Sequence, residues 1–122
     1  MRKFVLAAVL LLGAGASAGA AELAGSYDVR GTTLDGTRYS GTAEITMSSE
    51  DTCRVVWNTG GEPITGFCMW SGDTLAASYQ MDKDVGIVIY RIRDSGALDG
   101  VWTIADQDGV GNEVLVPQAP KP

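Results

Sequence analysis

Residues 52–71 constrain the fold most strongly, because they hold both cysteines of the chain and a Gly60-Gly61 pair between two apolar runs. Glycine pairs in this setting are typical of tight β-hairpin turns. If Cys53 bonds Cys68, their midpoint falls between the two glycines, so the turn and the cysteines predict the same register independently. Such a bridge, closing a ring of about 16 residues, stabilises a domain by roughly 3 kcal/mol. The chain has no histidine and no Cys-x-x-Cys spacing, so we interpret the pair as a structural disulfide rather than a redox pair or metal ligands.

Residues 1–20 have the pattern of a secretory signal peptide. Arg2 and Lys3 supply positive charge, an apolar run follows, and the small residues 16–20 are typical of a cleavage site. The apolar run is shorter than the roughly 20 residues that span a bilayer, so we predict a cleaved peptide rather than an anchor. The mature protein would then be periplasmic or secreted, where a disulfide can form.

The chain that remains after this cleavage is strongly acidic. Without Arg2 and Lys3 it has seven basic residues against fifteen acidic ones. Nucleic acids and anionic lipid surfaces repel such a protein. No further run of about 18 apolar residues follows. We therefore expect neither a nucleic-acid partner nor membrane insertion.

Short strands separated by turn signals fill residues 21–116, which we predict to be a single domain. Runs rich in β-branched and aromatic residues alternate with Gly, Asp and Ser clusters, and no stretch keeps a helical spacing of apolar residues. The final residues, 117–122, contain three prolines and are expected to form a disordered tail. The expected strands are residues 26–31, 38–48, 53–58, 64–71, 74–80, 85–93, 97–104 and 112–116.

Three of the expected strands share a template that favours a curled sheet. In the strands that begin near Tyr39, Ile64 and Leu98, an apolar residue is followed two positions later by glycine and then by further inward positions. A glycine inside a strand permits a tight bend, or lets a large ring pack over bare backbone. We therefore predict an all-β fold, an eight-stranded antiparallel up-and-down meander barrel with one hairpin disulfide. The alternative is a two-sheet β-sandwich.

The face of the hairpin opposite the cysteines is unexpectedly apolar, and the strand at residues 85–93 repeats this pattern. Outward apolar side chains on neighbouring strands would form a partner surface, with a homodimer as one candidate. The alternative is ordinary, scattered apolar residues on the protein surface. The candidate partner patch consists of Val56, Phe67, Met69, Ile87 and Ile89.

Aromatic side chains offer a candidate ligand site. Several rings that the alternation points inward would converge at one barrel mouth, where small barrels hold small ligands. The alternative is that the same rings fill the barrel interior as core. The candidate ligand mouth consists of Trp57, Trp70, Tyr79, Tyr90 and Trp102.

Catalytic and metal sites find little support in the sequence. Without histidine there is no Ser-His-Asp triad, and the paired aspartates lie in turns, where this residue is common for backbone reasons. We expect a non-enzymatic protein with no cofactor. Residues 106–113 are similar to a calcium loop, but they lack the third ligand before the glycine and the distant Glu of an EF-hand, so a plain acidic hairpin loop is favoured. The calcium candidates are Asp106, Asp108, Asn112 and Glu113.

Several runs, among them GSYDVRGTTLDGTRYSGTAEI, CRVVWNTGG, GDTLAASY and GALDGVWTI, cover nearly the whole mature chain. In these runs the chain resembles a group of small exported proteins of alphaproteobacteria, some of which are labelled fibronectin-binding. GALDGVWTI is also similar to strands of avidin-like and lipocalin-like barrels. This resemblance implies little about function, because the fibronectin-binding label is tied to no particular residues. From the chain as a whole we expect an exported, non-enzymatic binding protein for an unknown protein partner or small apolar ligand. The alternative is an adhesin-like (fibronectin-binding type) or inhibitor protein that acts through surface loops on a host or envelope protein.

Overall fold

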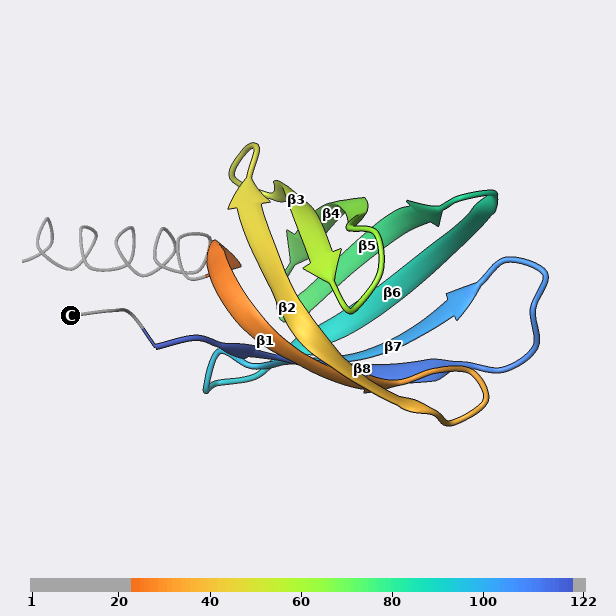
Figure 1. Cartoon of the computed structure of the whole chain (residues 1–122). Coiled ribbons are helices and arrows are strands. Elements are labelled where there is room, and N and C mark those ends of the chain that lie inside the picture. The colour runs from red at the N-terminus through yellow and green to blue at the C-terminus, as the bar shows by residue number, and fades with distance from the viewer. Residues whose placement is uncertain (1–22, 120–122) are drawn as a thin grey trace, which may run out of the picture.

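Eight β-strands follow one another in chain order, each antiparallel to the next, and the last pairs with the first to close the sheet (Figure 1). The computed structural model describes residues 23–119, so the predicted signal peptide lies outside the described residues. Within that range no helix has the length and apolar character needed to cross a bilayer. The strands are β1 (Gly25–Thr32), β2 (Arg38–Met47), β3 (Thr52–Asn58), β4 (Ile64–Ser71), β5 (Thr74–Met81), β6 (Asp84–Ile92), β7 (Leu98–Ile104) and β8 (Gly111–Pro117).

The predicted meander barrel is confirmed, and the alternative of a two-sheet sandwich is wrong. Each strand pairs with both neighbours along most of its length, including β8 with β1. No observed strand boundary differs from the expected one by more than one residue. Alternation was a sufficient guide because every strand buries only the face that points into the barrel.

The hairpin of β3 and β4 has the register that the cysteines and the turn predict. Cys53 lies opposite Cys68 and Trp57 lies opposite Ile64. The disulfide is present, with a Cα–Cα distance of 4.9 Å, and both cysteines are fully buried. Gly60 adopts a φ of +108° in the turn, which side chains disfavour.

Strand pairing continues past residue 116, the predicted end of the domain. Pro117 is the last residue of β8 and lies opposite Tyr27, and the Gln118 N–H donates to the Ser26 carbonyl at 2.9 Å. Proline is tolerated there because the pairing of β8 with β7 has already ended at Leu115, so no ladder bond needs the missing N–H. The expectation of a disordered tail from residue 117 is therefore wrong for these two residues, and residues 120–122 lie outside the described part.

The two ends of the barrel are built differently. The closed end carries the β2–β3, β4–β5 and β6–β7 turns, and Leu75, Leu98 and Leu115 are completely buried there. Leu23, just before β1, is also buried, and its carbonyl accepts a 2.7 Å hydrogen bond from the Tyr27 hydroxyl. The open end carries the other four loops, three of which extend to the right in Figure 1.

Candidate functional site

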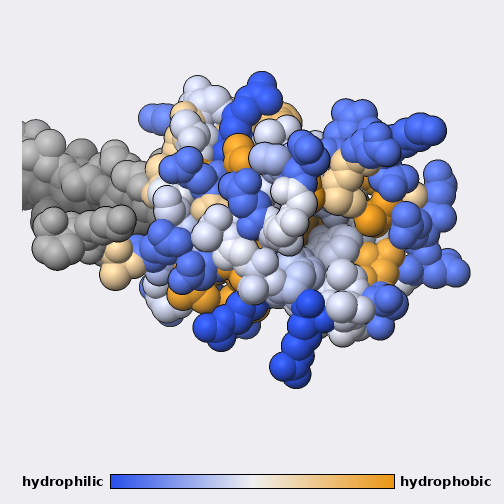
Figure 2. Space-filling view, viewed as in Figure 1, coloured by the Kyte–Doolittle hydropathy of each residue, from blue (hydrophilic) through white to orange (hydrophobic). Residues whose placement is uncertain are grey.

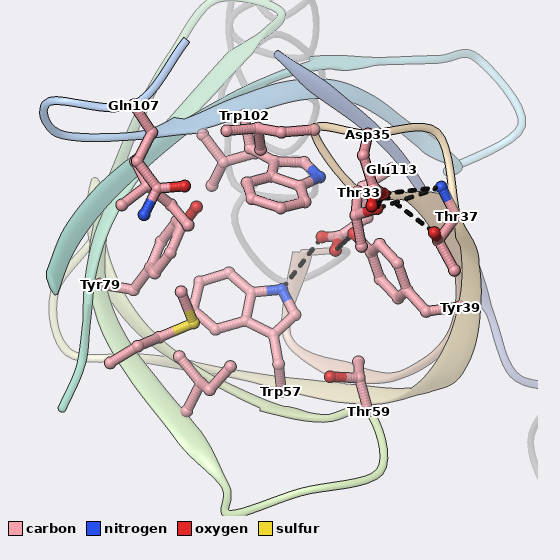
Figure 3. Close-up of a pocket in the computed structure, with 15 residues that line it drawn as sticks. Thr33, Asp35, Thr37, Tyr39, Trp57, Thr59, Tyr79, Trp102, Gln107 and Glu113 are labelled. Atoms are coloured by element: carbon pink, nitrogen blue, oxygen red, sulfur yellow. Dashed lines mark hydrogen bonds between the residues drawn. The ribbon is translucent and has the colours of Figure 1, made fainter. Parts of the chain in front are cut away.

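The open end of the barrel contains a cavity of about 690 Å³ (Figure 3). This volume lies within the range of small-molecule sites, roughly 300–1,000 Å³. Four aromatic rings from four different strands line it, namely those of Tyr39, Trp57, Tyr79 and Trp102. Trp57 and Tyr79 meet edge to face with ring centroids 5.4 Å apart, and Tyr39 and Trp102 do so at 6.3 Å. The rings therefore pack against one another around the cavity instead of filling it.

Glycines explain why these large rings leave space between them. A Cβ added at the glycine beneath each ring would overlap ring atoms, so each ring lies directly over bare backbone. Four of these glycines are the direct cross-strand neighbours of their rings, whereas Gly66 is diagonal to Trp57, two positions after its pair partner Ile64. The pairs of ring and glycine are Tyr39 with Gly31, Trp57 with Gly66, Tyr79 with Gly86, Tyr90 with Gly100 and Trp102 with Gly111.

A buried carboxylate lies at the inner side of the cavity. Glu113 is 7% exposed and points inward from β8, between Gly31 of β1 and Gly100 of β7. Because both neighbours lack side chains, the carboxylate has room beneath the rings. It lines the cavity together with them, as Figure 3 shows.

Three neutral donors hold the Glu113 carboxylate in place. The Tyr39 hydroxyl donates to Oε1 at 2.7 Å. The Trp57 indole N–H donates to Oε2 at 3.1 Å, and the Tyr90 hydroxyl donates to the same oxygen. The Trp57 N–H also lies 3.2 Å from the Tyr90 hydroxyl oxygen. The network fixes three rings and one carboxylate relative to each other, which pre-organises this side of the cavity.

The environment keeps the tyrosines of the barrel interior neutral. Burial, and then the negative charge of Glu113, raise the pKa of Tyr39, Tyr79 and Tyr90 above the ordinary value for a phenol. At the closed end burial alone raises the pKa of Tyr27. All three open-end phenols are therefore hydrogen-bond donors at neutral pH, and the Tyr79 hydroxyl donates to the Thr103 carbonyl at 3.1 Å.

The indole N–H of Trp102 is a buried donor with no hydrogen-bond partner among the described residues. Its contact with the Tyr39 hydroxyl lowers the pKa of that phenol, against the larger raising effects of burial and Glu113. The contact nevertheless lacks normal hydrogen-bond geometry. Figure 3 shows the nitrogen directed toward the side of the cavity where Glu113 and Tyr39 lie. A buried donor without a partner is costly, so an acceptor brought by a ligand would be stabilising.

The β1–β2 loop forms part of the cavity rim and is ordered by Asp35. The Asp35 carboxylate accepts hydrogen bonds from the Thr33 hydroxyl, from the Thr37 hydroxyl at 2.9 Å and from the Thr37 N–H at 3.2 Å. These bonds, with that of Thr33 the most important, lower the pKa of Asp35. The rim on this side is therefore a hydrogen-bonded loop rather than a loose one.

The five rings of the predicted ligand mouth do not all lie together. Trp57, Tyr79 and Trp102 line the cavity, and Tyr90 lies deeper, almost completely buried with its hydroxyl on Glu113. Trp70 lies at the closed end, where its indole N–H donates to the Glu50 carbonyl at 2.8 Å. Its placement at the mouth was wrong, because alternation gives the face of a residue but not the end of the barrel at which it lies.

Two residues of the site were not anticipated as ligand-site residues. Tyr39 begins the recurring strand template, which singled out its strand but not its ring. Glu113 precedes Leu115 by two positions and shares its inward face. The apolar character of Leu115 was therefore a signal that Glu113 points into the barrel.

The four calcium candidates are not brought together. Glu113 is inside the barrel, whereas its neighbour Asn112 points outward, and Asp106 and Asp108 are exposed in the β7–β8 loop. Alternation along β8 separates Asn112 from Glu113, so they cannot share an ion. Across residues 23–119 no group of three or more acidic, Cys or His side chains is arranged to hold a metal ion.

The predicted partner patch lies on the outer surface of β3 to β6. Phe67 and Met69 of β4 and Ile87 and Ile89 of β6 are each about half exposed, whereas Val56 is less exposed. In the pairing register, β5 places only the small residues Ser78 and Ala76 between these strands. On the face of the molecule shown in Figure 2, by contrast, apolar residues form only small separate areas among polar ones.

Known proteins support the fold but name no family. No protein-family model and no curated protein matches this chain. Several solved structures are similar, among them the following three. A redesigned β-barrel, b11L5F_LGL, is 22% identical with a TM-score of 0.66, over 82% of this chain and 95% of that one. The redesigned barrel mFAP1, bound to DFHBI, is 23% identical with a TM-score of 0.65, over 78% and 95%. A mutant of the fluorescent protein UnaG is 12% identical with a TM-score of 0.54, over 81% and 98%. The chain therefore has the fold of small eight-stranded barrels, which include proteins that bind small molecules.

Proposed function

We propose that this protein binds a small, largely apolar molecule in the cavity at the open end of its barrel. The observation that carries the proposal is the cavity itself, of about 690 Å³, which is bounded by rings that pack directly over glycines in the barrel wall. A barrel whose rings served only as core would use them to fill this volume, as the leucines do at the closed end. The redesigned barrel mFAP1, of similar fold, is bound to DFHBI.

Polar groups in the cavity define what such a ligand carries. Most of the wall is apolar or aromatic, so the body of the ligand would be stabilised by burial and ring contacts. The N–H of Trp102, unpartnered among the described residues, would donate to an acceptor atom of the ligand. A few fixed polar groups within an apolar cavity are typical of specific small-molecule sites.

The site favours binding over catalysis. Its interior carboxylate is held by three donors, and the hydroxyls beside it have a raised pKa, which makes them poor nucleophiles. We propose a non-enzymatic binding protein that is periplasmic or secreted. Support for export comes from the signal-peptide pattern of residues 1–20, from the disulfide and from the resemblance to exported alphaproteobacterial proteins.

The outward patch on β4 and β6 favours a second candidate function, binding of another protein. Four large apolar side chains about half exposed on two nearby strands would form a contact surface between two copies of this chain. The fibronectin-binding label of some resembling proteins makes an adhesin-like role the corresponding alternative. Sedimentation of wild type and of Ile89→Lys tests the first possibility: a dimer that the substitution dissociates supports it, and a monomer in both contradicts it.

Native mass spectrometry of the protein purified from a periplasm tests the leading proposal. We expect a small-molecule adduct on the wild type. Ile64→Trp, which adds bulk at the cavity wall, should lose the adduct, and Trp70→Phe at the closed end should keep it. A bare protein that also takes up no member of a small-molecule library, DFHBI included, would contradict the proposal.

A further inference from the structure

The charge of the Glu113 carboxylate is not balanced by any of the described residues. Its three partners are two phenols and an indole, all neutral donors. The side-chain ion pair found among the described residues joins Arg93 and Asp99 on the outer surface, at 2.5 Å, and does not involve Glu113. A carboxylate taken out of water is normally paired with a cation, because hydrogen bonds alone recover only part of its hydration.

The carboxylate also has room for a further partner. Its two oxygens together offer about four acceptor positions. Oε2 already accepts from Trp57 and Tyr90, whereas Oε1 accepts, among the described residues, from Tyr39 alone. The remaining position is therefore on Oε1, and Glu113 lines the cavity in which a ligand would lie.

The rest of the cavity has the same sign of charge. Of the described residues that line it, two are acidic, Asp35 at the rim and Glu113 inside, and none is Lys or Arg. The whole chain has a formal charge of −6 at neutral pH. Such a field attracts cations to the open end and disfavours anions.

The rings near Glu113 suit the apolar body of a cationic ligand. Tyr39, Trp57 and Trp102 bring three aromatic rings to the same side of the cavity as the carboxylate (Figure 3). The Tyr39 hydroxyl and the Trp57 N–H donate to the carboxylate, so these two rings direct their polar edges at it. The apolar ring surface beside the carboxylate can therefore pack against the body of a ligand whose charged head reaches Glu113.

Building on the proposed function, we infer that the ligand is a small organic ammonium compound. Its cationic head pairs with the open acceptor position of Glu113, an acceptor atom elsewhere in the ligand accepts from the Trp102 N–H, and its apolar body packs among the rings toward the rim. Neutral molecules of the same shape bind the same cavity more weakly, and anions are excluded.

Calorimetric titration of the folded protein with three matched probes tests this inference. The probes are phenylbutylamine, phenylbutanol and phenylbutyrate, which share one body and carry a positive, a neutral and a negative head. A charge-assisted hydrogen bond to the carboxylate should make the amine bind about tenfold or more tightly than the alcohol. The butyrate should not bind measurably.

Glu113→Gln is the variant that isolates the charge. It keeps a side chain of similar size and should abolish the preference for the amine while leaving the affinity of the alcohol within about twofold. Glu44→Gln is the matched control, because it removes the same charge from an exposed position on the outside of β2. This control should keep the full preference for the amine.

Tyr39→Phe provides a second test that does not depend on the folding of Glu113→Gln. Loss of its hydroxyl removes the donor to Oε1, so the ratio of amine to alcohol affinity should rise. Equal binding of amine and alcohol, or tighter binding of the alcohol or the butyrate, would overturn the inference alone and leave the proposed function standing. Failure of all three probes to bind would count against both.

Discussion

The closed and open ends of this barrel use the same strands and the same alternation, yet one is packed and the other is hollow. At the closed end large side chains face each other across strand pairs, as Leu98 and Leu115 do, and both are completely buried. At the open end a ring faces a glycine, as Tyr39 faces Gly31 and Tyr79 faces Gly86. Cross-strand pairing of large with large fills an interior, whereas large with glycine lines a wall.

The largest expected effect comes from shortening a side chain at the closed end. Leu115→Ala should lower the free energy of unfolding by about 2–5 kcal/mol, because it leaves a void in a fully packed region. Ile64→Ala, at the edge of the open cavity, should cost less than half as much, since that side chain is only partly buried. Urea unfolding measures both. Equal losses would show that the ends are packed alike.

Next in size is the addition of a single methyl group beneath a ring. Gly100→Ala places a Cβ against the Tyr90 ring and should cost about 1–3 kcal/mol, because that ring is also held by Glu113 and cannot move freely. Gly61→Ala is the control, since nothing lies near its added Cβ, and it should stay within about 0.5 kcal/mol. Thermal unfolding compares the two. A neutral Gly100→Ala would contradict the role assigned to these glycines.

The third effect is a loss of stability when the tyrosines of the barrel interior ionise at alkaline pH. All four tyrosines have a raised pKa in the folded protein, so they favour the fold while they remain neutral. Their contribution is complete below about pH 10, the ordinary phenol value, and is lost as pH rises through the folded values. Tyrosinate absorbance should therefore rise late and together with unfolding.

Removal of the Glu113 charge should sharpen this difference. In Glu113→Gln, the pKa of Tyr39 and Tyr79 should fall toward the ordinary value, whereas that of Tyr27, raised by burial alone, should not change. NMR signals of the individual tyrosine rings during a pH titration measure this. A uniform response of all the tyrosines would show that the two ends share one electrostatic environment.

The smallest expected effect concerns the rim. Asp35 has a lowered pKa, so its hydrogen bonds are present above the ordinary range near pH 4 and are lost as pH falls through the folded value. Asp35→Ala should leave the melting temperature almost unchanged but speed amide exchange of Thr37, which donates to that carboxylate. Unchanged exchange at Thr37 would mean that the rim loop is ordered by other contacts.

The fold was predictable because its main constraints are local. Two cysteines and a glycine pair set the register of one hairpin, and alternation set the inward face of each strand. The end at which Trp70 lies was also predictable, since Trp70 is the second-last residue of β4. It therefore lies near the β4–β5 turn, at the end opposite the β3–β4 turn. That inference requires following each strand from end to end rather than its face alone.

The buried carboxylate was much harder to predict. Alternation with Leu115 places Glu113 on the inward face, but its enclosure depends on the pairing of β8 with β1, whose residues are about eighty positions away in the sequence. Its network also depends on which rings reach it, and these come from β2, β3 and β6. An acidic residue next to an acidic loop is ordinarily solvated, so only the three-dimensional closure of the sheet shows that it is enclosed.

The three tryptophans allow the most direct test of the difference between the two ends. Trp57 and Trp102 lie at the open cavity and Trp70 lies at the closed end, so their indole N–H signals report on the two regions separately. Two-dimensional proton–nitrogen NMR during titration with phenylbutanol should shift the signals of Trp57 and Trp102 and leave that of Trp70 in place. A shift of Trp70 alone, or no shift at Trp57 and Trp102 at saturating probe, would contradict a ligand site at the open end.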